Sequence, residues 1–172
     1  MDKEIKIYVA NLGKYNEGIL QGAWFTLPVE LSEIKRKIGI DEEYEEWAIH
    51  DYESPFKIGE YDDIENLNEI AEEIDYMPDI VLENIDILIG WFDNSIQELI
   101  DNYANDLFIL EDISNESELG ENYIENLDLK LPEILGGVPL ESYLDYEAIG
   151  RDININTPYG ILIDGYWIEC KK

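Results

Sequence analysis

The chain has 172 residues, and its 45% hydrophobic and 12% aromatic content can fill a core, which excludes disorder along the whole length. A single cysteine, Cys170, excludes an internal disulfide or a thiolate metal cluster, and no apolar run is long enough to span a bilayer. Forty-one Asp and Glu against 11 Lys and Arg give a formal net charge of −30. The first residues do not form a signal peptide, so we expect a cytoplasmic protein.

The negative charge is concentrated in the middle of the chain. Residues 1–40 hold 5 acidic and 6 basic residues, whereas residues 41–130 hold 29 acidic and 2 basic residues. Residues 58–129 contain 22 Asp and Glu and no Lys, Arg or His. A salt-adapted protein would be acidic throughout, so this local excess favours a partner with a positive groove, although solubility and salt adaptation remain alternatives.

The first 55 residues predict a small α+β unit. Residues 5–9 alternate apolar and polar side chains and are rich in β-branched residues, which is typical of a strand. Residues 20–27 are expected to pair back on that strand, and residues 47–52 are expected to form a third. The glycine-containing residues 11–18 are expected to form a loop.

A helix is predicted over residues 29–38. Its apolar residues Leu31, Ile34 and Ile38 are three and four positions apart, which places them on one face. Gly39 follows directly and is expected to end the helix in a left-handed conformation.

The acidic middle has apolar residues at helical spacing, so it is expected to fold into helices with an inward apolar stripe. Helices are expected to start at Asp62 or Asp63, Pro78, Ser95 and Glu116, with a short strand at 108–110. Their expected inward residues are Ile64, Leu67, Ile70, Ala71 and Ile74 in the first helix; Ile80, Val81, Ile85, Leu88, Ile89 and Phe92 in the second; and Ile96, Leu99, Ile100 and Tyr103 in the third.

This pattern leaves the carboxylates on the outer faces of the helices. One acid about every 3.3 residues, at a rise of roughly 1.5 Å per residue, gives about one carboxylate per 5 Å of helix, against a phosphate every 3.4 Å or so along a DNA strand. A carboxylate surface that imitates a phosphate backbone is therefore expected. Its candidate partner-binding residues are Asp62, Asp63, Glu65, Glu69, Glu72, Glu73, Asp75, Asp79, Glu83, Asp86, Glu98, Asp101, Glu111, Asp112, Glu116, Glu118, Glu121 and Glu125.

The last part of the chain is again expected to mix helix and strand. A turn is expected at 136–139, followed by a short helix with Leu140, Tyr143, Leu144 and Ala148 on one face. Residues 150–155 and 161–168 are expected to form a hairpin around a turn at 156–160. The fold class is therefore expected to be α+β.

The sequence gives little support for an enzyme. His50 is the single histidine, and its place in a predicted strand favours a structural role. The spacing of Gly13 and Gly18 lacks the Lys and Ser/Thr of a phosphate-binding loop. No stretch has the Asp-x-[Asp/Asn]-x-[Asp/Asn]-Gly pattern of a calcium loop. We expect no catalytic residue, no cofactor and no specific metal site.

Five segments stand out, in order and over nearly the whole chain: residues 7–18 (IYVANLGKYNEG), 22–25 (GAWF), 43–53 (EYEEWAIHDYE), 137–139 (GVP) and 143–152 (YLDYEAIGRD). Together they resemble the ArdA family of antirestriction proteins. The last segment is similar to that family's antirestriction motif, in which the candidate motif or dimer-contact residues are Tyr143, Leu144, Asp145, Tyr146, Gly150, Arg151 and Asp152. From the charges alone, Arg151 is expected to form an ion pair with a nearby carboxylate, such as Asp145 or Asp152.

The resemblance implies a non-enzymatic protein encoded on mobile genetic elements. Members of the family are elongated homodimers with three small domains per chain, and they imitate bent B-form DNA. They occupy the DNA-binding groove of Type I restriction–modification enzymes, so that incoming unmodified DNA escapes cleavage. The expected domains of this chain are an α+β domain at 1–60, an acidic helical domain at 61–105 and an α+β domain at 106–172.

One alternative function remains open. An acidic adaptor or chaperone for a basic nucleic-acid-binding protein would need the same charge but not a DNA-like geometry. The two functions differ in shape dependence, because a DNA mimic should prefer a groove of duplex size. Neither function requires direct binding of nucleic acid or a membrane.

Overall fold

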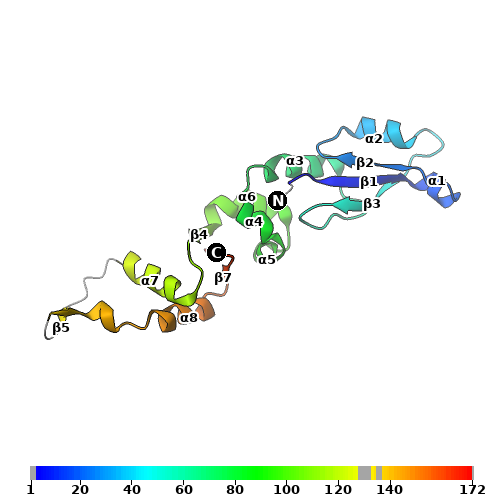
Figure 1. Ribbon diagram of the computed structural model, residues 1–172. Coiled ribbons are helices and arrows are strands. Elements are labelled where there is room, and N and C mark those ends of the chain that lie inside the picture. Colours follow the sequence, from blue (N-terminus) through cyan, green and yellow to red (C-terminus); the bar gives the residue numbers. More distant parts are fainter. Residues whose placement is uncertain (1–2, 128–132, 135–136, 172) are drawn as a thin grey trace. The chain divides into compact units, whose positions relative to one another are not determined.

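The computed structural model of the protein describes residues 3–127, 133–134 and 137–171. Helices and strands both occur, which confirms the α+β class (Figure 1). The chain divides into two compact units, Met1–Asp101 and Asn102–Lys172. The division into three domains at residues 60 and 105 stays a prediction. In the part of the chain that is described, no helix is both long and apolar enough to cross a membrane.

Unit 1 begins with an antiparallel sheet and continues into a run of helices. Its elements are β1 (Lys6–Asn11), α1 (Leu12–Asn16), β2 (Gly22–Thr26), α2 (Leu31–Ile38), β3 (Trp47–Glu53), α3 (Ile64–Ile74), α4 (Asp79–Glu83), α5 (Ile85–Leu88), a 3-10 turn η1 (Ile89–Trp91) and α6 (Ile96–Asp106), which crosses into unit 2. The three strands, the helix α2 and the helix α3 agree with the sequence-based expectations. The sheet order is β2-β1-β3.

The helix α2 covers one face of this sheet (Figure 1). Alternate side chains of β1, Ile7 and Val9, are fully buried, and so are Ile34 and Ile38 of α2. Gly39 has φ +70°, so it ends α2 in the predicted left-handed conformation.

The loop prediction for residues 11–18 is wrong, because these residues contain the helix α1. The buried Asn11 side chain starts this helix: its Oδ1 accepts a hydrogen bond from the Lys14 N–H at 3.0 Å. Its Nδ2 donates to the Gly39 carbonyl at 3.0 Å, so the side chain is held from both sides. A helix of five residues is too short to show a helical period in the sequence, and the two glycines of this segment are typical of a loop.

The single helix predicted from Pro78 is also wrong, because Asn84 divides it into α4 and α5. The buried Asn84 side chain donates to the Ile80 carbonyl at 2.9 Å, so it takes the acceptor that its own backbone N–H would use in a continuous helix. Its carbonyl then accepts from the Leu88 N–H at 3.0 Å and begins α5. The expected inward residues remain buried, apart from the half-buried Ile89.

Unit 2 packs two helices against a second antiparallel sheet. Its elements are β4 (Leu107–Glu111), α7 (Glu116–Asn126), β5 (Glu133–Ile134), β6 (Val138–Pro139), a 3-10 turn η2 (Leu140–Tyr143), α8 (Tyr146–Asn156), β7 (Gly160–Ile163) and β8 (Tyr166–Cys170). The sheet order is β4-β8-β7, and β5 pairs with β6. The core contains Ile113, Leu119 and Trp167. The predicted α7 and β4 are confirmed, while part of the turn predicted at 136–139 lies outside the described residues.

Two predictions in unit 2 are wrong and share one cause. Residues 150–155 are helical rather than extended, and the helix predicted around residues 140–148 begins later, at Tyr146. The Asp145 side chain accepts from the Ala148 N–H at 3.0 Å and so starts α8. The alternating Ile and Asn residues of this segment suggested a strand, but capping and packing on α7 decide for a helix. The hairpin is instead formed by β7 and β8.

The helices α7 and α8 touch backbone to backbone. A Cβ atom on Gly150 would overlap the Glu116 carbonyl of α7, and one on Gly120 would overlap the Tyr146 carbonyl of α8. Because glycine has no Cβ atom, the two helix backbones approach more closely at these positions than any other residue would allow.

Candidate protein-binding surface

The helix α3 carries a row of glutamates on its outer face. Glu65, Glu69, Glu72 and Glu73 are separated by four, three and one positions, and all four are exposed. The opposite face of the helix is buried and consists of Ile64, Leu67, Ile70, Ala71 and Ile74. The row covers about 12 Å along the helix axis, given a rise of 1.5 Å per residue. The sequence thus folds into an amphipathic helix whose outer face is mainly anionic.

Asp63 starts this helix, because its Oδ1 accepts from the Glu65 and Asn66 N–H groups at 2.8 and 3.0 Å. The other end is less favourable. Carboxylates near a helix C-terminus face the negative end of the helix dipole, and α3 has no basic residue in its last turn.

The needed cation comes from a distant part of the sequence. Lys3 Nζ donates to the carbonyls of Met77 at 3.0 Å and Asp75 at 3.4 Å, and it forms an ion pair with Asp79 at 3.0 Å. The hydrogen bond and charge of Lys3 lower the pKa of Asp79. Lys3 therefore stabilises the junction of α3 and α4.

The acidic surroundings also affect a neighbouring tyrosine. The negative charge of Glu60 raises the pKa of the exposed Tyr61, and a hydrogen bond between the two side chains raises it further. An anionic neighbour disfavours the phenolate, so the shift reports the sign of the local field.

Unit 2 has a second acidic helix face. Glu118, Glu121 and Glu125 of α7 are three and four positions apart, while Leu119 and Gly120 between them are buried. Asn115 caps the helix by accepting from the Glu118 N–H at 3.0 Å, and Glu118 accepts from the Ser114 N–H at 2.6 Å. These two hydrogen bonds hold the first turn of α7 and the preceding residue Ser114 in place.

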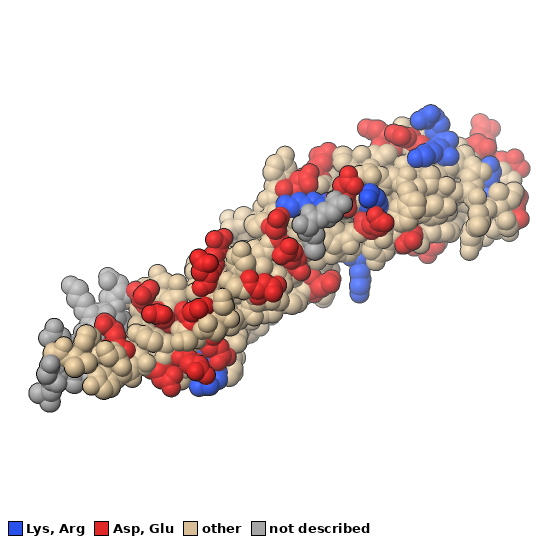
Figure 2. Space-filling view, in the orientation of Figure 1, with Lys and Arg blue, Asp and Glu red and all other residues tan. Residues whose placement is uncertain are grey.

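Most of the candidate carboxylates are exposed; Asp62, Glu116 and Glu118 are half-buried. Some have structural partners in addition: Asp62 accepts from the Gly59 N–H at 2.7 Å, and Asp101 accepts from Gln97 at 2.9 Å. On the face seen in Figure 2, Asp and Glu side chains are more abundant than Lys and Arg. The partner-binding role of these carboxylates stays a prediction.

Most of these carboxylates have no cation near them in the sequence, because residues 58–129 contain no Lys, Arg or His. The ion pairs of the described residues join Lys3 to Asp79, Lys6 to Glu4 and Glu53, and Arg151 to Glu147. Nowhere in the described ranges do three or more His, Cys, Asp or Glu side chains gather in a geometry for a metal ion.

The candidate motif residues are divided between several local structures. Tyr143 is exposed in η2, Leu144 is extended, and Asp145 caps α8. Gly150 lies at the contact with α7, where the carbonyl of Tyr146 faces Gly120.

The predicted ion pair of Arg151 with a nearby carboxylate is confirmed, but the partner is neither of the two expected residues. Arg151 Nη1 lies 4.0 Å from Glu147, one helical turn away, and not beside Asp145 or Asp152. These residues lie on one helix, so the i,i+4 spacing decides the pairing. The role of Gly120 as the counterpart of Gly150 was missed, because a single glycine within a helical pattern gives no signal of its partner.

Comparison with known proteins adds a family-level finding. A family model described as "Antirestriction protein (ArdA)" matches residues 7–168. No curated protein matches the chain.

Proposed function

Because the chain belongs to the ArdA family of antirestriction proteins, we propose that it protects incoming mobile DNA by imitating B-form DNA. It occupies the DNA-binding groove of Type I restriction–modification enzymes. The observation that carries this proposal is the outer face of α3, where four exposed glutamates lie on one side of a helix without a local cation. The acidic face of α7 supports it from the other unit.

The mechanism follows from how such enzymes hold DNA. Lys and Arg side chains of a DNA-binding groove replace the counterions on phosphates, which supplies much of the affinity. Carboxylates fixed on helices offer the same cations an alternative set of anions without the ordering cost of a flexible acidic tail. The surface presents no bases, so the protein competes with DNA of any sequence.

The chemistry of the helix ends gives further support. Glu72 and Glu73 lie in the last turn of α3, where they oppose the helix dipole and repel each other and Glu69. Exposed glutamine would serve solubility at these positions without that cost. Binding a cationic groove explains why the carboxylates are there.

The proposal includes the remaining expectations for the family. The protein acts as a homodimer in the cytoplasm, contacts the enzyme and not nucleic acid, and uses the segment from Tyr143 to Asp152 in dimer contact or inhibition. The three predicted domains at 1–60, 61–105 and 106–172 would form successive parts of the imitated duplex.

Competition with DNA tests the proposal. Duplex DNA bound to a Type I methyltransferase core is titrated with this protein at low and moderate salt, and a basic protein without a duplex-sized groove serves as the control. We expect displacement near one equivalent per DNA site, weakening with salt. Equal binding to both proteins would instead favour a general acidic adaptor, and no displacement would contradict the proposal.

A further inference from the structure

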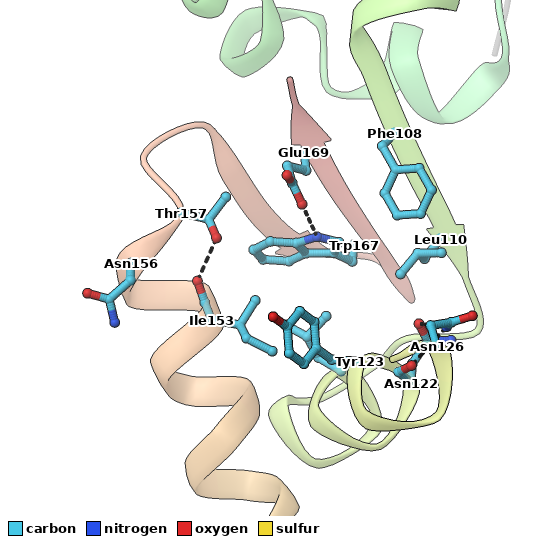
Figure 3. Close-up of a pocket in the computed structure, with 11 residues that line it drawn as sticks. Phe108, Leu110, Asn122, Tyr123, Asn126, Ile153, Asn156, Thr157, Trp167 and Glu169 are labelled. Atoms are coloured by element: carbon cyan, nitrogen blue, oxygen red, sulfur yellow. Dashed lines mark hydrogen bonds between the residues drawn. The ribbon is translucent and has the colours of Figure 1, made fainter. Parts of the chain in front are cut away.

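Unit 2 contains an open cavity of about 310 Å³ between its sheet and the helices α7 and α8 (Figure 3). Three aromatic rings line it: Phe108 from β4, Tyr123 from α7 and Trp167 from β8. Glu169 is the charged residue of its lining. The volume is at the lower end of the range for ligand sites, roughly 300–1,000 Å³, so it suits one amino-acid side chain.

The floor of the cavity is rigid. Trp167 is 2% exposed, and its indole ring lies over Gly160, where a Cβ atom would meet the ring at 2.5 Å. Leu110 and Leu162 flank Trp167 on the neighbouring strands. Since the ring is held on three sides, a ligand meets a preformed surface and need not order it.

Glu169 places a carboxylate beside this ring. It follows Trp167 by two positions on β8, so both side chains lie on the same face of the sheet. Trp167 Nε1 donates to Glu169 Oε2 at 3.3 Å, which orients the carboxylate (Figure 3). A carboxylate can accept about four hydrogen bonds, so one donor leaves it able to bind a cation.

The wall of the cavity already attracts a cation of this chain. Lys171 Nζ lies 4.1 Å from the centroid of the Phe108 ring. Phe108 and Tyr123 are 39% and 48% exposed, so part of each ring is available to a partner. The cavity therefore combines aromatic faces and a carboxylate, which is the chemistry that recognises a cationic side chain.

We propose that this cavity receives an arginine side chain of the partner enzyme. Arginine fits better than lysine because its planar guanidinium stacks on aromatic rings, is weakly hydrated and can form paired hydrogen bonds with a carboxylate. Charge complementarity favours the same occupant, because residues 102–172 hold 15 acidic and 4 basic residues. The inference rests on the proposed function, since it assigns one arginine of the DNA-binding groove to this cavity.

A small probe tests the cavity without any enzyme. N-acetyl-arginine methylamide is titrated into the ¹⁵N-labelled protein, and the Trp167 indole N–H signal is followed by NMR. The lysine and citrulline counterparts are titrated in parallel. We expect the arginine probe to shift this signal, and citrulline, which lacks the charge, to bind roughly tenfold more weakly. Equal shifts with arginine and citrulline, or none with arginine, would overturn the inference.

Two variants, one that removes a negative charge and one that removes a positive charge, test whether the cavity contributes to binding of the enzyme. Glu169→Gln removes the anion, while Lys171→Gln removes the competing cation and leaves the cavity intact. In the DNA-displacement experiment, Glu169→Gln should raise the half-displacing concentration by roughly tenfold, and Lys171→Gln should lower it about twofold. A residue that merely stabilised the fold would not give these opposite changes.

Matched charge changes on the same unit serve as controls. Glu141→Gln and Asp164→Asn alter exposed charges outside both the cavity and the candidate binding residues, so each should change displacement by less than about twofold. If Glu169→Gln behaves like Glu141→Gln while the wild-type protein still displaces DNA, the arginine site is wrong and the proposed function stands. If the wild-type protein fails to displace DNA although the probe binds, the proposed function fails, and with it the enzyme as the source of the arginine.

Discussion

The helices α2 and α3 are both amphipathic and both belong to unit 1, yet their last turns carry opposite charge. The last turn of α2 contains Lys35, Arg36 and Lys37, which complement the helix dipole. The last turn of α3 contains glutamates and no cation, and Lys3 from the start of the chain donates to the carbonyls of its C-cap residue Asp75 and of Met77. One helix therefore follows the rules of local stability, whereas the other departs from them where the protein faces its proposed partner.

The largest effect is expected from neutralising the outer face of α3. The variant Glu65→Gln, Glu69→Gln, Glu72→Gln, Glu73→Gln should weaken DNA displacement roughly tenfold or more, if each exposed ion pair contributes about 0.2–1 kcal/mol. The free energy of unfolding of the same variant should rise by about 1–2 kcal/mol, because repulsion among the glutamates and with the helix dipole is relieved.

Chemical denaturation and the competition experiment together check this prediction. Function and stability should move in opposite directions. A variant that loses both would show that the glutamates serve the fold, and the contrast with α2 would then have no functional meaning.

Removing Lys3 should show how much this distant cation contributes to the stability of the junction between α3 and α4. Lys3→Met removes the ion pair with Asp79 and the donor to the Met77 carbonyl, and it should lower the free energy of unfolding by about 1 kcal/mol. Urea unfolding measures this loss. Lys57→Met, which removes one positive charge elsewhere in unit 1, is the control. Equal stability of the two variants would contradict the assigned role of Lys3.

Neutralising the last turn of α2 should have the opposite effects: lower stability and nearly unchanged DNA displacement. Replacing Lys35, Arg36 and Lys37 by glutamine should destabilise the protein by about 0.5–1 kcal/mol, because the favourable dipole interaction is lost. DNA displacement should change by less than about twofold, since these cations lie outside the candidate surface. Substantially weakened displacement would show that this basic turn takes part in binding.

The smallest effect concerns pH. Lys3 lowers the pKa of Asp79 in the folded protein, so this contact stabilises the fold above the ordinary aspartate value of 3.8. That contribution is lost as the pH falls through the lower, folded value. The difference in stability between wild type and Asp79→Asn should therefore be present at neutral pH and vanish in acid. Stability curves for both proteins between neutral and strongly acidic pH provide the measurement.

Sequence periodicity predicts α3 and α7 well because each has a regular apolar stripe, whereas part of the equally long α8 was predicted to be a strand. The buried residues of α3 are the five that the spacing selects, and Asp63 is one of the two predicted caps. Periodicity fails where a single polar side chain sets a boundary. Asn11 starts a helix that is too short to show a pattern, and Asn84 interrupts one that looks continuous.

The candidate site divides in the same way. The sequence shows which carboxylates exist and which helix faces carry them, because spacing determines a face. It does not show that Lys3 reaches α3, that Gly120 meets Gly150 or that Trp167 and Glu169 border a cavity with Tyr123. Each of these depends on contacts between residues that are far apart in the chain.

The contact between Gly120 and Gly150 has a consequence for mutational tolerance. A surface made of many carboxylates is redundant, so single replacements on it should pass almost unnoticed. The two glycines have no such redundancy, since any side chain at either position meets the backbone of the opposite helix. A saturation scan of unit 2 should therefore show two fully intolerant positions on helices whose acidic faces accept nearly every residue.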